Sequence, residues 1–241
     1  TIRVVDRCGP HRVSATPTKG PAMHTPSRPI EWADRLAKLY TPVVADVLDK
    51  LGFRNQSMNP RVRPLWPEAK AAGFALTVQT VPARDLAPAH PYAGELAAVD
   101  SLQTGDVLVV SESACSFWGE LLSTSAQYRG CRGVVLDGPT RDSLAIRAMG
   151  FPVFHVGFHP ADSLGRLDVV AHNTPISCAD VLVYPGDLVL ADHDGVVVVP
   201  NGAAEETLRL AEEKVSGENL VRKALASGMT TAEAFKTYGI L

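Results

Sequence analysis

Three charged residues, Glu120, Arg141 and Asp142, have the types and the spacing that metal-assisted chemistry requires. Glu120 directly follows Gly119 at the start of a predicted helix, and twenty residues separate it from the Arg141–Asp142 pair. That pair follows a predicted strand and a Gly-Pro turn in "VVLDGPTRDS", where a second helix is predicted to begin with Thr140 as its N-cap. A cation in a first helical turn opposes the helix dipole by roughly 0.3–1 kcal/mol, and such a local cost is often offset by function.

The two helix starts would form a reaction site if the fold brought them together. The site would then hold the free backbone N–H groups near Glu120, one guanidinium and two carboxylates. Two carboxylates suit a partly hydrated Mg²⁺ or Mn²⁺ ion, and helix N–H groups suit a substrate carboxylate. An arginine beside the metal suits the negative charge of an enolate oxygen. These groups together predict lyase chemistry on a 2-oxo acid, and a merely structural ion pair between helix ends is the alternative.

The surrounding pattern of elements predicts an α/β layered domain with a mixed sheet. Strands and helices alternate through the middle of the chain, and short strands separated by Pro-Gly-Asp and Asp-Gly turns follow. Helices are predicted at about 31–40, 42–51, 93–101, 119–129, 141–149 and 203–226, and strands at about 73–81, within 104–111, at 133–137 and in short segments between 151 and 200.

The composition is that of an ordinary globular protein of 241 residues with a net charge of −3. This charge predicts neither nucleic acid nor an anionic membrane as a partner. No apolar run reaches the ~18–20 residues that span a bilayer, and the first residues lack the apolar core of a signal peptide, so a cytoplasmic location is expected. Residues 1–29 are interpreted as an arm or leader and residues 30–241 as a single domain.

Other arrangements of reactive side chains point to weaker alternatives. His155 and His159 have a spacing of four, but they flank Gly157 in a predicted strand and turn, so the helical geometry of a zinc site is missing. Asp192 and Asp194 are interpreted as solvated turn residues. Motifs for a serine nucleophile, a P-loop or a dinucleotide site are absent from the sequence.

The four cysteines are scattered without C-x-x-C spacing, which is not the pattern of a structural zinc site or a disulfide framework. We therefore interpret them as free buried thiols. They are Cys8, Cys115, Cys131 and Cys178.

The segment "GELLSTSAQYRGCRGVVLDGPTRDSLAIRAMGFPVF", continued by "PGDLVLADHDGVVVVP", resembles the RraA-like superfamily. Within it, the chain resembles the class II pyruvate aldolases, which cleave 4-hydroxy-4-methyl-2-oxoglutarate and 4-carboxy-4-hydroxy-2-oxoadipate. The resemblance runs from about Thr41 to the C-terminus. It implies a three-layer β/β/α fold of the swivelling-domain type, with a mixed sheet and flanking N- and C-terminal helices.

The resemblance also implies roles for the charged residues. The family carries an acidic residue, twenty intervening residues and then Arg-Asp, which fall here on Glu120, Arg141 and Asp142. Asp142 would ligate the metal, Mg²⁺ or Mn²⁺, and Glu120 would hold it through water. Arg141 would bind the oxo and carboxylate oxygens and stabilise a pyruvate enolate. The first acid of the aldolases is usually Asp, so the longer Glu120 could shift a water molecule or indicate a different substrate.

Further expectations concern the substrate and the assembly. Gly119 and the backbone N–H groups of Leu121 and Leu122 would hold the pyruvyl carboxylate of a small 2-oxo acid. Family members also decarboxylate oxaloacetate through the same enolate. They assemble as homotrimers or homohexamers with sites at subunit interfaces, where the neighbouring subunit's C-terminal helix supplies an acidic residue that Glu218 matches here.

Two other functions follow from relatives of the same superfamily. The RraA proteins contact an RNA-degradation enzyme and inhibit it, so a non-catalytic binding protein is the rival to the lyase. A methyltransferase label attached to similar sequences is disfavoured here because no Gly-rich cofactor loop is visible. The two acids and the arginine favour the enzyme over the binding protein.

Overall fold

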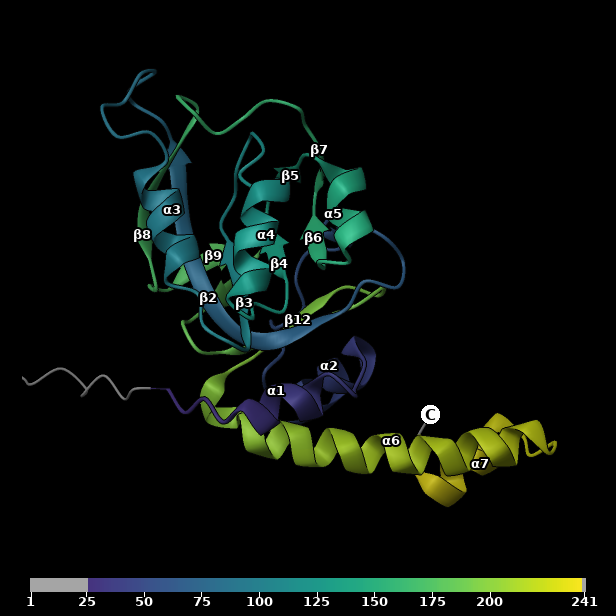
Figure 1. The fold of residues 1–241 in the computed structure, drawn as a ribbon. Coiled ribbons are helices and arrows are strands. Elements are labelled where there is room, and N and C mark those ends of the chain that lie inside the picture. The colour runs from purple at the N-terminus through teal and green to yellow at the C-terminus, as the bar shows by residue number, and fades with distance from the viewer. Residues whose placement is uncertain (1–25, 240–241) are drawn as a thin grey trace, which may run out of the picture.

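The computed structural model describes residues 26–239, and its centre is a mixed eight-stranded sheet (Figure 1). Strands β2, β3, β4 and β6 are parallel neighbours, whereas β1, β8, β11 and β12 pair in antiparallel fashion. The order is β1-β6-β4-β3-β2-β11-β12, with β8 also paired to β2. The strands are β1 (Arg63–Pro64), β2 (Ala71–Pro82), β3 (Asp106–Val110), β4 (Val134–Leu136), β6 (Val153–His155), β8 (Leu167–His172), β11 (Leu188–Ala191) and β12 (Val196–Val199).

The parallel strands are buried on both faces, as their continuous apolar sequences require. Successive side chains of a strand point to opposite faces. In β3, Leu108 and Val110 therefore join the core on one side, and Val107 and Val109 join the core on the other. Two separate hydrophobic cores thus fix the central strands from above and below.

Three layers result from this burial. Helices α3 (Ala93–Asp100), α4 (Glu120–Tyr128) and α5 (Ser143–Met149) cover one face of the parallel strands (Figure 1). A hairpin of β9 (Ile176–Cys178) and β10 (Val181–Val183) packs against the other face. The helices, the sheet and the hairpin confirm the three-layer β/β/α architecture expected from the resemblance.

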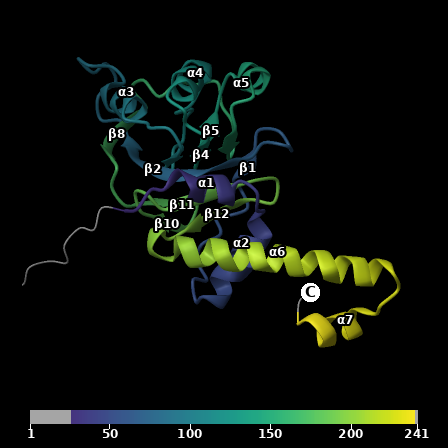
Figure 2. The same cartoon turned by 60° about the horizontal axis from the view of Figure 1, so that its bottom comes forward.

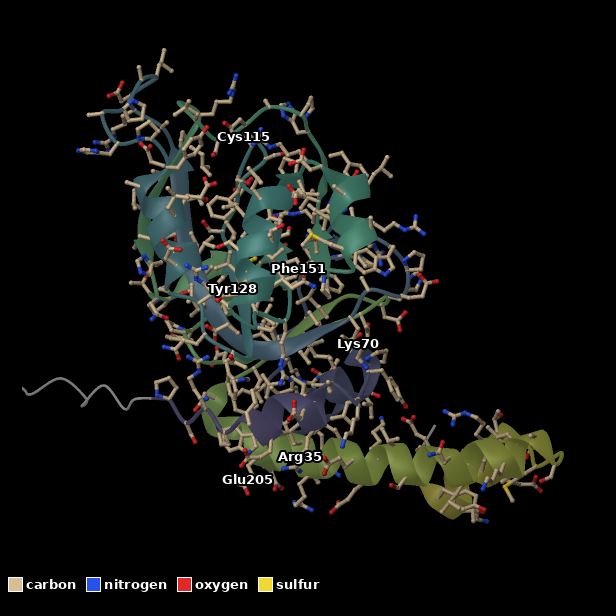
Figure 3. All side chains as sticks on the ribbon, in the orientation of Figure 1. Arg35, Lys70, Cys115, Tyr128, Phe151 and Glu205 are labelled. Carbon is tan, nitrogen blue, oxygen red and sulfur yellow. The ribbon has the colours of Figure 1, made fainter. Side chains whose placement is uncertain are left out.

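Three further helices pack on β2, β11 and β12, away from α4 and α5. They are α1 (Ile30–Leu36), α2 (Thr41–Lys50) and α6 (Ala204–Ala226), which follows the short 3-10 turn η1 (Asn201–Ala203). Arg35 of α1 lies beside α6 and donates to both carboxylate oxygens of Glu212, at 2.7 and 2.8 Å (Figure 3). Asp192 accepts hydrogen bonds from the backbone N–H and the hydroxyl of Thr41, so this turn residue fixes the start of α2.

The C-terminal part of the chain contains one helix more than the sequence analysis predicted. Beyond α6, the helix α7 (Thr231–Tyr238) turns back beneath it (Figure 2). Thr230 and Glu233 form a reciprocal capping box that starts α7. The signal was therefore present in the sequence, but the predicted helices end at about residue 226.

The start of α5 differs from the prediction. Its N-cap is Asp142 and not Thr140. Thr140 instead belongs to the short strand β5 (Pro139–Thr140), which pairs with β7 (Gly157–Phe158). Arg141 therefore precedes the helix and does not occupy its first turn, so the expected conflict with the helix dipole does not arise.

The structure also bears on the predictions about free thiols and membrane-spanning segments. Cys115, Cys131 and Cys178 are free and buried, which confirms the prediction for these three. Cys8, like most of the predicted arm at 1–29, lies outside the described residues. Within residues 26–239 no helix has the length and apolar character needed to cross a membrane.

Candidate active site

Two loops that follow neighbouring parallel strands run side by side at the carboxyl edge of the sheet. One leads from β3 to α4, and the other leads from β4 to α5. The backbone carbonyl of Trp118 accepts from the N–H of Arg141 at 3.1 Å and from the hydroxyl of Thr140 at 3.0 Å. The structure thus brings together the two helix starts, at the edge where ligands bind in open α/β sheets.

Asp142 reaches across from one loop to the other. Its Oδ2 accepts a hydrogen bond from the backbone N–H of Glu120 at 3.1 Å and lies 3.8 Å from Nε of Arg141. A Cβ on Gly119 would lie only 2.6 Å from this oxygen, so glycine is required for the close approach. Asp142 itself has a left-handed backbone with φ of 56°, a strained conformation of the kind that clusters at functional sites.

The two carboxylates provide a donor set that fits a partly hydrated divalent cation. Glu120 and Asp142 line one open cavity together with Leu121, Leu144 and Met149. Within residues 26–239 no group of three or more His, Cys, Asp or Glu side chains is arranged to hold a metal. Mg²⁺ is commonly bound by only one or two carboxylates with water and substrate completing the shell, so two acids satisfy this requirement.

The start of α4 offers free N–H groups to an anion. The first hydrogen bond within this helix runs from the N–H of Ser123 to the carbonyl of Gly119, at 3.1 Å. The N–H groups of Leu121 and Leu122 precede that bond and have no partner in the helix. Both leucines line a cavity of about 280 Å³ that also contains Arg141 and Asp142. The cavity can therefore hold a carboxylate between the helix start and the guanidinium.

Arg141 is held by a second acid that the sequence analysis did not single out. Its Nη2 lies 3.4 Å from Oδ1 of Asp162, and the other oxygen of Asp162 accepts from the hydroxyl of Tyr92. Burial acts to raise the pKa of Asp162, but the hydrogen bonds from Tyr92 and Ser163 and the charge of Arg141 bring it below its usual value. Asp162 is therefore the anionic partner that orients the guanidinium.

A third acid, Glu95 of α3, lies in the wall of the same cavity. It is only 9% exposed, and its Oε2 accepts a hydrogen bond from the hydroxyl of Ser163 at 2.9 Å. Burial raises the pKa of Glu95 to about 7. The sequence contained a signal for this residue, because Glu95 shares a helix face with the buried Ala98 and Val99. No comparable signal marked Asp162, since its loop has no periodicity.

Trp118, next to Gly119, and the two histidines considered as a zinc pair have structural contacts. Trp118 is fully buried, and its indole N–H donates to the hydroxyl of Ser123 at 2.7 Å, so it packs the start of α4. Nδ1 of His155 lies 2.7 Å from the carbonyl of Gly157. The ring of His159 accepts from the N–H of Ala161 at 3.0 Å.

Glu218 is the one predicted site residue that lies elsewhere in its own chain. It is on α6, where it accepts from the hydroxyl of Tyr40 and faces Nζ of Lys214 at 3.8 Å. Helix α6 packs over β11, β12 and the start of β2, whereas α4 packs over the parallel strands at the other end of the sheet (Figures 1 and 2). A role for Glu218 in the site therefore requires a second copy of the chain.

Comparison with known proteins assigns the chain to a family. The family model described as RraA-like, Aldolase/RraA, matches residues 41–198. Protein DlpA of Legionella pneumophila is 29% identical over 204 residues, which cover 81% of this chain and only 32% of DlpA. A protein of Halalkalibacterium halodurans, named "Putative 4-hydroxy-4-methyl-2-oxoglutarate aldolase", is 30% identical over 209 residues, which are 86% of this chain and 94% of that protein.

A solved structure supports the same assignment. Streptomyces coelicolor RraAS2, described as an unusual member of the RNase ES inhibitor RraA protein family, superimposes with a TM-score of 0.72 at 30% identity. The match covers 82% of this chain and 99% of RraAS2. The matched fold and the matched sequence segment agree with the resemblance drawn from the motif. The chain belongs to the RraA-like family.

Proposed function

We propose that the protein is a divalent-metal-dependent lyase that cleaves a carbon–carbon bond of a 2-oxo acid and releases pyruvate. The reaction is aldol cleavage, decarboxylation of an oxaloacetate-type acid, or both. The observation that carries the proposal is the position of Asp142, whose carboxylate lies against the start of α4 beside Arg141. The names of relatives such as the Halalkalibacterium protein support an aldolase.

Each group of the site has a role in this reaction. Asp142 and Glu120 would hold Mg²⁺ or Mn²⁺, and a divalent cation in this place supplies Lewis acidity toward the oxo group. The N–H groups of Leu121 and Leu122 bind the carboxylate of the substrate. Arg141 donates to the oxo oxygen, and its charge stabilises the enolate that forms when the carbon–carbon bond breaks.

The test is release of pyruvate by the full chain. Metal-stripped protein is incubated with oxaloacetate or with 4-hydroxy-4-methyl-2-oxoglutarate, with and without Mg²⁺ or Mn²⁺, and pyruvate is followed by a coupled assay. We expect pyruvate only when the metal is present. A folded protein that binds Mn²⁺ and yet releases no pyruvate from either acid would contradict the proposal.

Two variants with matched controls assign the chemistry to the site. Arg141→Ala and Asp142→Asn should each lower kcat/KM by roughly 100-fold or more, because removing one donor to a developing oxyanion costs about that much. Arg147→Ala and Asp194→Asn change the same residue types at exposed positions. Wild-type rates in the two site variants would remove these residues from the mechanism.

We also propose that the protein acts as a homotrimer or homohexamer with sites at subunit interfaces. Large apolar side chains near the site are exposed in the single chain, with Leu121 at 79% and Leu144 at 82%. Glu218 of a neighbouring subunit would then complete the site. Light scattering should give three or six times the chain mass of 25.7 kDa. A monomer that retains activity would refute the interface site.

The second candidate function is inhibition of an RNA-degradation enzyme by direct contact. The similarity to RraAS2, which is described as belonging to an RNase inhibitor family, supports it. The two proposals differ in a direct measurement, because an inhibitor slows RNA cleavage by a bacterial RNase E-type enzyme without any 2-oxo acid present. Inhibition that persists in Arg141→Ala would indicate a binding function independent of the site.

A further inference from the structure

Glu95 is a buried acid in the wall of the site cavity, and it has no role in the reaction as proposed above. One of its oxygens accepts from Ser163, and the described part of the chain provides no hydrogen bond to Oε1. Glu95 shares the cavity with Arg141 and with the start of α4, where the substrate carboxylate would bind. A carboxyl group in this position can present an O–H donor, or a free oxygen, to the bound molecule.

The protonation state of Glu95 suits acid–base chemistry near neutral pH. Burial raises its pKa to about 7, the hydrogen bond from Ser163 acts in the opposite direction, and Asp162 and Arg141 contribute opposing charges. A group with a pKa near the working pH is present in both forms, which is the condition for efficient proton transfer. Asp162 differs, because its pKa is held below the usual value and it remains a carboxylate.

Glu95 also lies between two cavities. Together with Tyr92 it lines the site cavity and a second cavity of about 340 Å³. The second cavity continues along β8 past Gly165, Asp168 and Val169. When substrate fills the site cavity, water can still approach Glu95 from the second one. Its position thus provides separate routes for the substrate and for the solvent proton.

We propose that Glu95 is the acid–base residue that delivers a proton to C3 of the pyruvate enolate. The inference rests on the proposed lyase function. Cleavage of the C3–C4 bond leaves the electron pair on the enolate. In aldol cleavage the C4 hydroxyl releases its proton to solvent as the C4 carbonyl forms, and in decarboxylation C4 leaves as carbon dioxide. The Glu95 carboxyl proton then forms the new C3–H bond, and the oxo group is restored. Glu95 remains as a carboxylate and recovers a proton from water in the second cavity.

Exchange of the methyl hydrogens of pyruvate isolates this step, because it needs the base and the enolate but breaks no carbon–carbon bond. The protein with Mg²⁺ is incubated with pyruvate in D₂O, and loss of the methyl signal is followed by NMR. Glu95→Gln should lower the exchange rate by at least about 100-fold, the usual contribution of a general acid or base. Oxaloacetate loss should fall much less, because carbon dioxide leaves before the enolate is protonated. Glu112→Gln, at an exposed position, is the matched control.

The pH profile provides a second readout that a merely structural role would not move. Exchange requires the carboxylate form, so the wild-type rate should rise with pH through about 7. Ser163→Ala removes the hydrogen bond that favours the carboxylate, and it should move this rise to higher pH. The titratable groups around Glu95 are Asp162, Arg141, Tyr92 and Cys115, with Asp142 in the site cavity and His90 and Asp168 in the second cavity.

The outcomes separate the two proposals. Wild-type protein that neither exchanges pyruvate nor decarboxylates oxaloacetate overturns the lyase and, with it, the role of Glu95. Normal exchange in Glu95→Gln, or an unmoved profile in Ser163→Ala, overturns only the role of Glu95. A large loss of exchange with retained oxaloacetate turnover supports both. Because retained turnover requires folded protein, a variant that merely fails to fold cannot give that result.

Discussion

Gly119→Ala tests whether the contact between the two loops prepares the metal site. The added Cβ would lie 2.6 Å from Oδ2 of Asp142 and 3.4 Å from Nε of Arg141. An ordinary contact begins at 3.4 Å, so the carboxylate must move by about 0.8 Å. Metal–ligand distances are fixed to about 0.2 Å, which makes this displacement large for a ligand. The carboxylate also loses its bond from the N–H of Glu120.

The expected consequence is a loss of metal affinity without a loss of fold. Displacing groups that orient a ligand typically lowers metal affinity by about 10–100-fold, which corresponds to roughly 1.4–2.8 kcal/mol. The backbone of Gly119 is extended, with φ of −148°, so alanine introduces no backbone strain. Binding of Mn²⁺ is measured from the signal of the free ion by electron paramagnetic resonance, and the free energy of unfolding is measured in urea.

Gly202→Ala is the matched control, because a Cβ at Gly202 meets nothing within 4 Å and φ there is not positive. It should leave Mn²⁺ binding unchanged. Unchanged affinity in Gly119→Ala as well would refute the argument that the position of Asp142 against the start of α4 prepares the metal site.

Two further predictions concern the acids around Arg141. The pKa of Glu95 is raised from 4.5 to about 7, so its contribution to stability is present below about pH 4.5 and is lost as the pH rises through 7. Glu95→Gln should therefore be more stable than wild type at pH 8, by up to about 3 kcal/mol in urea unfolding. A difference in stability that stays the same from pH 4 to pH 8 would contradict this. The hydrogen bond to Asp162 holds the pKa of Tyr92 above its usual value, so Asp162→Asn should lower that pKa. Ultraviolet titration measures it, and tyrosine pKa values identical to those of the wild type would show that this pairing is wrong.

Much of the fold was predictable because its signals are local. The apolar run of β3 and the turns on either side of it define a buried strand, and a glycine before Glu120 marks the start of α4. The start of α5 was less predictable, because Thr140 is a good N-cap by type. Its hydroxyl bonds to Trp118, a residue of another loop, and no local pattern reveals that competition.

The candidate site was predictable only in part, for a similar reason. Glu120, Arg141 and Asp142 follow one another in two successive loop–helix units, so their spacing in sequence reflects their position in space. Asp162 and Tyr92 come from distant segments, and only the folded chain places one against the other. Glu95 is an acid on an apolar helix face, a signal that the sequence analysis did not use, and its neighbour Ser163 is 68 residues away.

The short pairing of β5 with β7 has a consequence for the energetics of ligand binding. Two isolated parallel bridges lie beside this pair of strands, between Trp118 and Thr140 and between Ser116 and Asp162. Three loops are thereby hydrogen-bonded to one another before any substrate arrives. The conformational entropy of ordering them is lost during folding and not during binding, which leaves more of the interaction energy for affinity. Such linked loops should also open together, as one cooperative unit in hydrogen exchange.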